Sequence, residues 1–213
     1  MSSEPGLRQR KKERTRALIA DAARRLFAER GFEAVTVADV ARAAEVSEGT
    51  VFNYFPTKEE LFFGGMETFE ARLVDEVRSR PAGESVLDAF RRVVLGGVDR
   101  LATEEAVAAI TSAAPIIGAS RALQAREREV VARYTEQLAE VIRAETGAGP
   151  DAVEPAAVAA ALMGAQRALV AYVHGRVLAG ERGRTLTNAV RREAARAFDR
   201  LDRGLAGYAV KPS

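Results

Sequence analysis

Apolar residues recur along the chain at spacings of three and four positions, which is the repeat of an α-helix that buries one face. In the first such segment, Leu18, Ala22 and Leu26 mark the apolar face, and Gly31 follows as a residue that ends helices. No stretch shows a convincing alternation of polar and apolar residues, as a half-buried strand would. The pattern therefore predicts an all-α fold.

Capping residues divide this helical pattern into separate elements. Thr36 with Asp39, and Thr57 with Glu60, have the spacing of capping boxes, and Ser47 is a further N-cap candidate. Residues 1–9 are expected to form a disordered arm. Helices are expected over residues 11–29, 37–43, 47–54, 57–78, 85–101, 104–113, 119–145, 152–179 and 186–206.

Composition excludes several classes of function. The chain contains no Cys, so it holds no disulfide, zinc–thiolate site or Cys nucleophile. Its single His, His174, argues against a His-rich metal site or a His-dependent catalytic triad. The nucleotide-binding, metalloprotease and serine-hydrolase motifs of common enzymes are also missing. We therefore expect no catalytic residue, no cofactor and no bound metal.

Hydropathy indicates a protein without a membrane partner. The most apolar stretch, residues 156–180, is interrupted by Gln166, Arg167, His174 and Arg176. A membrane-spanning helix needs about 20 apolar residues in a row, so this stretch predicts a buried helix of a soluble protein. The N-terminus lacks the apolar run of a signal peptide. We expect a cytoplasmic location.

Basic residues are unevenly distributed along the chain. The net charge of +2 does not by itself indicate a nucleic-acid partner. Residues 7–16, however, contain six basic residues and one acidic residue. This basic N-terminal arm could contact a DNA backbone or minor groove. The alternative is a solvated tail without a partner.

Residues 36–55 have the layout of a helix-turn-helix, in which two short helices are joined by a tight turn. A helix can enter the major groove of DNA if its N-terminal half carries nothing bulky. Here that half begins with Ser47, Glu48, Gly49 and Thr50. Gly49 permits close approach to DNA, and Thr50 offers a hydroxyl and a methyl group.

Three further residues complete the candidate DNA-binding surface. Asn53 can form a bidentate hydrogen bond with the edge of an adenine. Tyr54 and Lys58 lie where a phenol and an ammonium group could hold phosphates. Because any helical hairpin can imitate a helix-turn-helix, these residues alone leave an ordinary structural hairpin as the other interpretation.

The run LFAERGFEAVTVADVARAAEVSEGTVFNYFPTKEELF, residues 26–62, resembles the DNA-binding domain of the TetR family. The resemblance depends on four elements that occur together: a Gly-Phe pair after the first helix, a Thr cap, a Val-Ser turn and a Phe-Pro-x-Lys-Glu ending. It implies an all-helical homodimer whose larger domain binds a small ligand.

The resemblance also implies roles for individual residues. Base contacts are implied for Glu48, Gly49, Thr50 and Asn53. Backbone contacts are implied for Thr36, Thr50, Tyr54 and Lys58. Many members of the family have an aromatic residue where this chain has Asn53, so their operator sequences cannot be transferred to this protein.

The expected organisation has two domains. Residues 1–56 would form a three-helix DNA-binding domain with the basic N-terminal arm, and residues 57–213 a larger helical ligand-binding and dimerisation domain. The expected function is that of a ligand-responsive repressor, which binds a palindromic double-stranded DNA operator as a homodimer. The alternatives are an enzyme with a helical fold and a structural DNA-binding protein without an effector.

The last two long helices are predicted to form the dimer interface, because the first of them carries small residues that allow two helices to approach closely. The first of these helices contributes Ala157, Ala160, Ala161, Gly164 and Ala168. The second contributes Ala194, Phe198 and Leu201. Packing within one chain is the alternative interpretation of this second group.

The larger domain is expected to hold an apolar pocket for a small-molecule effector. The candidate lining is Met66, Phe69, Phe90, Val94, Ile110, Ile117, Tyr134, Met163 and Arg167. A charged Arg167 within an apolar helix would need a partner, either a ligand anion or an acidic side chain. The segment SRALQARERE, residues 120–129, resembles TetR-type regulators that respond to acyl-CoA-like ligands, which implies a small apolar effector such as an acyl-CoA.

Overall fold

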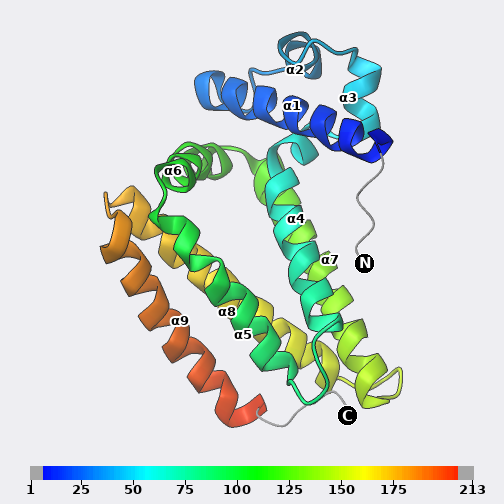
Figure 1. Ribbon diagram of the computed structural model, residues 1–213, viewed down its shortest axis with the longest axis vertical. Coiled ribbons are helices and arrows are strands. Elements are labelled where there is room, and N and C mark those ends of the chain that lie inside the picture. The colour runs from blue at the N-terminus through cyan, green and yellow to red at the C-terminus, as the bar shows by residue number, and fades with distance from the viewer. Residues whose placement is uncertain (1–6, 206–213) are drawn as a thin grey trace. The chain divides into compact units, whose positions relative to one another are not determined.

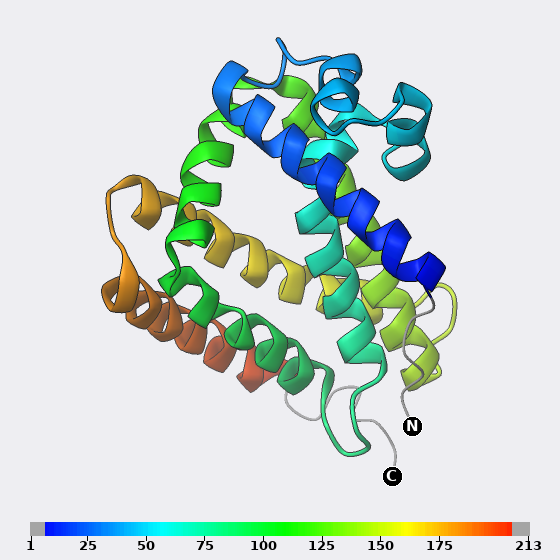
Figure 2. The same ribbon diagram turned by 45° about the horizontal axis from the view of Figure 1, so that its top comes forward.

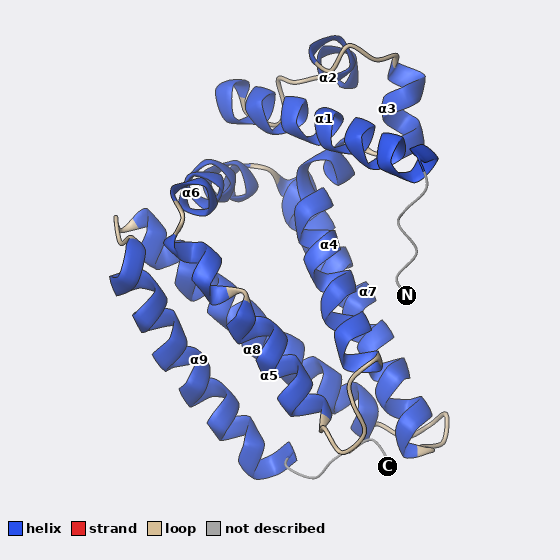
Figure 3. Cartoon of the chain, in the orientation of Figure 1, coloured by secondary structure: helices blue, strands red, loops and turns tan. Residues whose placement is uncertain are grey.

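The computed structural model describes the backbone of residues 7–205, and their side chains except those of residues 7–9, 64–68 and 205. Residues 7–205 form helices and connecting turns without a strand, which confirms the all-α fold (Figure 1, Figure 3). In chain order the elements are α1 (Leu7–Arg30), α2 (Val37–Ala43), α3 (Glu48–Tyr54), α4 (Lys58–Arg78), α5 (Val86–Gly96), the 3-10 helix η1 (Val98–Ala102), α6 (Glu104–Ala119), α7 (Arg121–Thr146), α8 (Glu154–Leu178) and α9 (Gly183–Leu205).

The chain divides into two compact units. The first unit comprises the residues up to Glu67 together with Pro115–Glu127, and the second comprises Thr68–Ala114 together with the residues from Arg128 onward. The chain therefore passes from one unit to the other three times, after residues 67, 114 and 127. The first unit is larger than the 1–56 segment because it also includes the start of α4 and the corner between α6 and α7.

The core of the first unit joins α1 to the two short helices that follow it. Ile19 and Phe27 of α1 are fully buried in one cluster with Val40 of α2 and Val51 of α3. Leu123, near the start of α7, is fully buried in the same cluster. The α6–α7 corner is therefore a packed part of this unit.

Hydrogen bonds confirm the predicted starts of α2 and α3. The Thr36 hydroxyl accepts from the Asp39 N–H at 3.1 Å, and the Asp39 carboxylate accepts from the Thr36 N–H at 3.0 Å, so both halves of the capping box are formed. The Ser47 hydroxyl accepts from the Thr50 N–H at 3.1 Å. Between the two helices, Glu45 has a φ of 55°, in the left-handed region that tight turns use.

The second unit is built around α8, which packs against both α5 and α9. Figure 2 shows α9 running beside α5, with which it is also in contact. Phe90 of α5 and Phe198 of α9 are fully buried, and their ring centroids lie 6.1 Å apart. Just after α4, the buried Arg80 pairs with Glu145 of α7, with Nη1 3.0 Å from Oε1.

Two predicted helices have different bounds in the structure. The helix expected over 85–101 is divided into α5 and η1, with Gly96 and Gly97 at the break, since glycine has a low helix propensity. The helix expected to end at residue 113 continues to Ala119 and contains Pro115. A proline removes one backbone hydrogen bond but can be accommodated when the flanking turns are held by packing.

The prediction of a disordered arm over residues 1–9 is wrong for residues 7–9, which belong to α1. Arg, Lys and Gln dominate the start of this helix and are good helix formers, so the helix begins before its apolar pattern does. Residues 1–6 lie outside the described residues. In the described part of the basic N-terminal segment, the exposed basic side chains are those of Arg10, Lys11, Lys12, Arg14 and Arg16.

Among the described residues, α8 is the one single helix that is long and apolar enough to cross a membrane, by length and composition. In its most apolar window, 39% of the residues are buried by the rest of the chain. These include Leu162 and Met163, which lie in the interior of the second unit. The buried face of α8 is thus a core face, whereas its opposite face is exposed.

Candidate functional site

The helix α3 buries Val51 on its inner face, and its exposed surface carries polar residues together with Phe52, which is 47% exposed. Val51 is fully buried, whereas Ser47, Glu48, Gly49 and Asn53 are exposed. Thr50 is half-buried, and its Oγ1 lies 2.8 Å from the Ser47 Oγ. The N-terminal half of α3 therefore carries small polar groups at its surface, as the sequence predicts.

Gly49 is not required by the packing of the first unit. A Cβ built on this residue would lie 3.9 Å from the Ser47 Oγ and would meet no other atom within 4 Å. Its backbone lies in an ordinary helix rather than in the left-handed region. The fold therefore leaves room at this position for a side chain, which would project from the exposed face.

Thr36 is exposed at the start of α2, where the structure uses its polar atoms in the cap. Its hydroxyl lies 2.7 Å from the Asp39 Oδ2. The hydrogen bonds from the Thr36 side chain and backbone hold the pKa of Asp39 below its ordinary value. The cap therefore keeps its carboxylate ionised at the positive end of the α2 dipole.

Lys58 and Tyr54 are half-buried and already have contacts within the first unit. The Lys58 ammonium donates to the carbonyl of Val35 at 3.1 Å and lies 4.2 Å from the ring centroid of Phe32. The carbonyl of Tyr54 accepts from Arg16 at 3.3 Å. Lys58 thus has a structural role that the sequence did not reveal, beside any contact with phosphate.

The α6–α7 corner is joined to the first unit by polar contacts as well as by Leu123. The Ser120 hydroxyl donates to the Glu33 carboxylate at 2.8 Å. The Arg126 guanidinium pairs with Glu60 at 3.2 Å. Ile117 packs against the core of this unit and is not part of the pocket described next.

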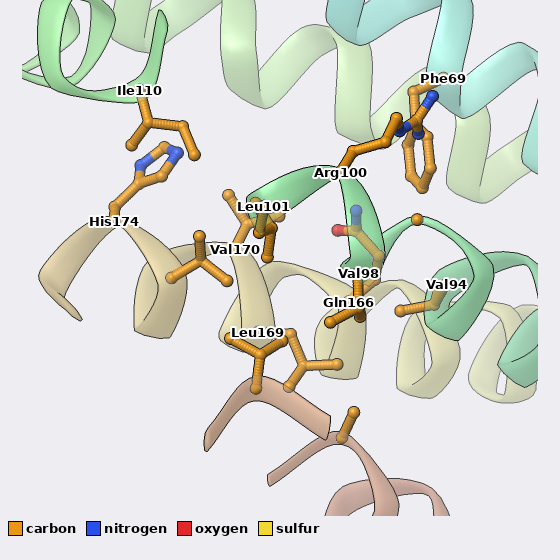
Figure 4. A pocket seen from close by; sticks show the side chains of 14 residues that line it. Phe69, Val94, Val98, Arg100, Leu101, Ile110, Gln166, Leu169, Val170 and His174 are labelled. Atoms are coloured by element: carbon orange, nitrogen blue, oxygen red, sulfur yellow. The ribbon is translucent and has the colours of Figure 1, made fainter. Parts of the chain in front are cut away.

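A pocket of about 220 Å³ lies in the second unit. Its lining comes from α4, α5, η1, α6, α8 and α9 (Figure 4). The lining residues are Phe69, Val94, Gly97, Val98, Arg100, Leu101, Ile110, Gln166, Leu169, Val170, Val173, His174, Val190 and Ala194. Of the predicted ligand-binding residues, Phe69, Val94 and Ile110 are brought together here.

The other predicted ligand-binding residues lie elsewhere. Phe90 and Met163 are almost completely buried in the core, and Tyr134 is 9% exposed, but none of the three lines the pocket. Arg167 is exposed on α8, so its charge needs no partner from the protein. Met66 lies outside the residues whose side chains are described.

The exposed face of α8 carries a continuous stripe of apolar residues, which we call the α8 stripe. Its members are exposed and follow one another at spacings of three and four: Ala157, Ala160, Gly164, Ala168, Ala171, Gly175 and Leu178. Ala194 and Phe198 of α9 are instead fully buried within the chain. The structure thus favours the intrachain interpretation for these two α9 residues.

Comparison with known proteins identifies relatives of the first unit and of most of the chain. Residues 19–64 match the model of the bacterial regulatory proteins of the tetR family. TcmR of Streptomyces glaucescens, an HTH-type transcriptional regulator, is 40% identical over 97 residues, which cover 44% of this chain and 43% of TcmR. The chain thus spans less than half the length of that relative.

Two further comparisons extend over most of the chain. MftR of Mycobacterium tuberculosis is 30% identical over 159 residues, covering 73% of this chain and 77% of MftR. The solved structure of the SmeT–triclosan complex has a TM-score of 0.58 at 17% identity, covering 90% of this chain and 91% of that one. The second similarity concerns the fold.

Proposed function

The chain belongs to the TetR family of bacterial regulatory proteins, and we propose that it is a repressor that binds a palindromic double-stranded operator as a homodimer. In this proposal, a small effector bound in the second unit releases the operator, and the protein acts in the cytoplasm. The observation that carries the proposal is the outer face of α3, where small polar side chains are exposed without steric obstruction.

In the proposed complex, α3 reads bases in the major groove. Asn53 bonds to an adenine edge, Thr50 contributes its methyl group, and Glu48 accepts from a cytosine amino group or repels other bases. Exposed basic residues near the start of α1 contact phosphates. These assignments agree with the exposure of Asn53 and Glu48.

We assign the covering of the α8 stripe to a second copy of the chain. The stripe ends at Leu178, which is 54% exposed, and the exposed Arg167 lies beside it, between Gly164 and Ala171. Alanine and glycine allow two such helices to pack closely about a twofold axis. A palindromic operator needs two recognition helices about 34–36 Å apart or a multiple of that distance, so dimerisation is part of the proposed mechanism.

The effector is proposed to act through the three chain crossings between the units. The pocket is lined from α4 and α6, and both helices continue into the first unit. An effector releases DNA only if it binds the non-binding conformation more tightly, and a tenfold loss of DNA affinity needs about 1.4 kcal/mol of differential affinity. A small apolar group suits the mainly apolar lining, and the acyl chain of an acyl-CoA is the first such group to test.

A mobility-shift assay with the DNA upstream of the chain's own gene tests this proposal. We expect one shifted species that contains two chains per operator. When acyl-CoAs of different chain lengths are added in separate titrations, at least one chain length should abolish this species. No sequence-selective shift would refute the regulator assignment. A selective shift that resists every small molecule and metabolite extract would favour a structural DNA-binding protein without an effector.

A further inference from the structure

Gln166 of α8 is a buried residue whose side-chain amide has no hydrogen-bond partner among the described residues. The residue is 6% exposed and lies in the lining of the pocket. Within the described part of the chain its side chain forms no hydrogen bond, and its amide atoms are not sealed from the cavity. Figure 4 shows the amide pointing away from α8 toward η1. Because buried polar groups are normally hydrogen-bonded, the amide indicates a polar group on whatever fills the pocket.

Arg100 of η1 brings a positive charge to the same end of the pocket. Among the described residues, the lining contains no Asp or Glu, and Arg100, whose side chain is exposed, has no ion pair. A Cβ on Gly97 would lie 3.5 Å from the Arg100 Nη2 and 3.9 Å from the Phe69 ring. These are ordinary contact distances, and they place both the guanidinium and the Phe69 ring close to Gly97, as Figure 4 shows.

Apart from His174, the other lining residues are apolar or glycine, and they extend away from Gln166 and Arg100. Along the pocket, Leu101 and Val170 lie next to Gln166, and Ile110 lies at the far end near His174 (Figure 4). The volume of about 220 Å³ is below the range of roughly 300–1,000 Å³ that is typical of ligand pockets. The pocket therefore suits a molecule with one compact polar end and a short apolar body.

We propose that the pocket binds a monocarboxylate with a medium-length apolar chain. The carboxylate accepts hydrogen bonds from the Arg100 guanidinium and the Gln166 amide N–H, and the chain extends past Leu101 toward Ile110. Charge-assisted hydrogen bonds of this kind are stronger than neutral ones, so the charge on the head group decides affinity. The inference rests on the proposed function only in taking this pocket as the effector site.

Calorimetric titration of the purified full chain, without DNA, tests the head group directly. The probes are octanoate, 1-octanol, octylamine and octanoyl-CoA, which share a chain length and differ at the polar end. We expect octanoate to bind about tenfold more tightly than 1-octanol, and octylamine to bind most weakly. Octanoyl-CoA separates the free acid from its thioester, which offers a carbonyl acceptor without the charge, so it should bind more weakly than octanoate.

Two substitutions locate the effect. Arg100→Met should remove the preference of octanoate over 1-octanol while 1-octanol still binds. Gln166→Glu, which puts a carboxylate beside the ligand's own, should weaken octanoate more than 1-octanol. Arg128→Met is the matched control, because Arg128 is exposed on α7 and does not line the pocket. Thermal unfolding of each variant checks that the chain is folded.

The outcomes distinguish this inference from the proposed function. Equal binding of octanoate and 1-octanol, no binding of either, tighter binding of octanoyl-CoA, or a preference that survives Arg100→Met would overturn the carboxylate assignment. If octanoate binds through Arg100 but leaves the operator complex intact, the carboxylate assignment stands and the effector role of the pocket fails. Release of the operator by octanoate from the wild type, and not from Arg100→Met, supports both.

Discussion

Among single residues, Gly49 separates what the fold requires from what DNA binding requires. Nothing in the first unit occupies the space of a Cβ at this position, and its backbone is helical. Alanine is a better helix former than glycine by about 1 kcal/mol in a helix interior, and by less near an end. A methyl group here would stand on the surface proposed to face the major groove.

We therefore predict opposite effects of Gly49→Ala on stability and on DNA binding. Thermal unfolding should show a stability equal to or above that of the wild type, by up to about 1 kcal/mol. Operator affinity, measured by fluorescence anisotropy, should fall at least tenfold because the added methyl group prevents close approach. Unchanged affinity would mean that this part of α3 does not face DNA.

Glu70 of α4 carries a carboxyl group whose ionised form is disfavoured in the folded protein. The residue is 3% exposed, and its Oε2 has no hydrogen-bond partner among the described residues. Burial raises the pKa of this carboxyl from 4.5 to about 7. Between these two values the folded chain binds more protons than the unfolded chain, so the free energy of unfolding falls as the pH rises.

Replacing this carboxyl with an amide should remove that pH dependence. Glu70→Gln cannot ionise, so its stability relative to the wild type should be lowest below pH 4.5 and rise through pH 7. The gain between these limits should be about 3 kcal/mol, from 1.36 kcal/mol per unit of pKa. Denaturant unfolding at pH 4 and pH 8 measures it, and a difference that does not change with pH would contradict a raised pKa.

Residue roles were predicted less well than residue positions. Thr36 and Ser47 were identified as caps because a cap depends only on neighbours three residues away. The contact of Lys58 with Val35 and Phe32 depends on tertiary packing, which no local pattern encodes. Lys58→Ala should therefore lower stability as well as any affinity for phosphate.

Among the elements, the helix-turn-helix was predictable from the sequence, whereas the pocket was predictable only for Phe69, Val94 and Ile110. The starts of α2 and α3 depend on local capping residues, which can be identified directly in the sequence. The pocket depends on the break at Gly96 and Gly97, which creates η1 and places Arg100 in the lining. A continuous helix over 85–101 would turn Arg100 to another direction, so its role could not be foreseen.

The exposed face of α8 yields a prediction about assembly. Ala168 lies in the middle of the α8 stripe, and Ala168→Glu would place two like charges near each other across a twofold axis. Because such juxtaposition costs several kcal/mol, the dimer dissociation constant should rise about 100-fold or more. Light scattering at micromolar concentration should then show monomers, and the variant should lose most of its affinity for a palindromic operator.

An exposed alanine outside the α8 stripe provides the control for this experiment. Ala109→Glu adds the same charge on α6, at an exposed position, and should leave the dimer intact. A wild-type chain that is monomeric would refute the proposed homodimer, and an Ala168→Glu variant that remains dimeric would place the interface on another surface.

At the scale of the whole molecule, the chain's three crossings between its units are the feature that the pattern of helices did not reveal. The sequence pattern predicts a domain boundary at residue 56, whereas the first compact unit continues to Glu67 and includes residues 115–127. The reason is that Leu123 and the Ser120–Glu33 hydrogen bond join residues far apart in the chain. Such long-range packing decides which segments move together.

In the proposed dimer, α3 of each copy reads one of two symmetric half-sites in the DNA. Selection of bound sequences from a random DNA library, by the wild type and by Asn53→Ala, tests it most directly. We predict an inverted repeat for the wild type, and for Asn53→Ala the same repeat with relaxed preference at one base position per half-site, at a cost of about 1–3 kcal/mol. If no palindrome is enriched, or if both proteins select identical sequences, α3 does not read bases in two symmetric half-sites.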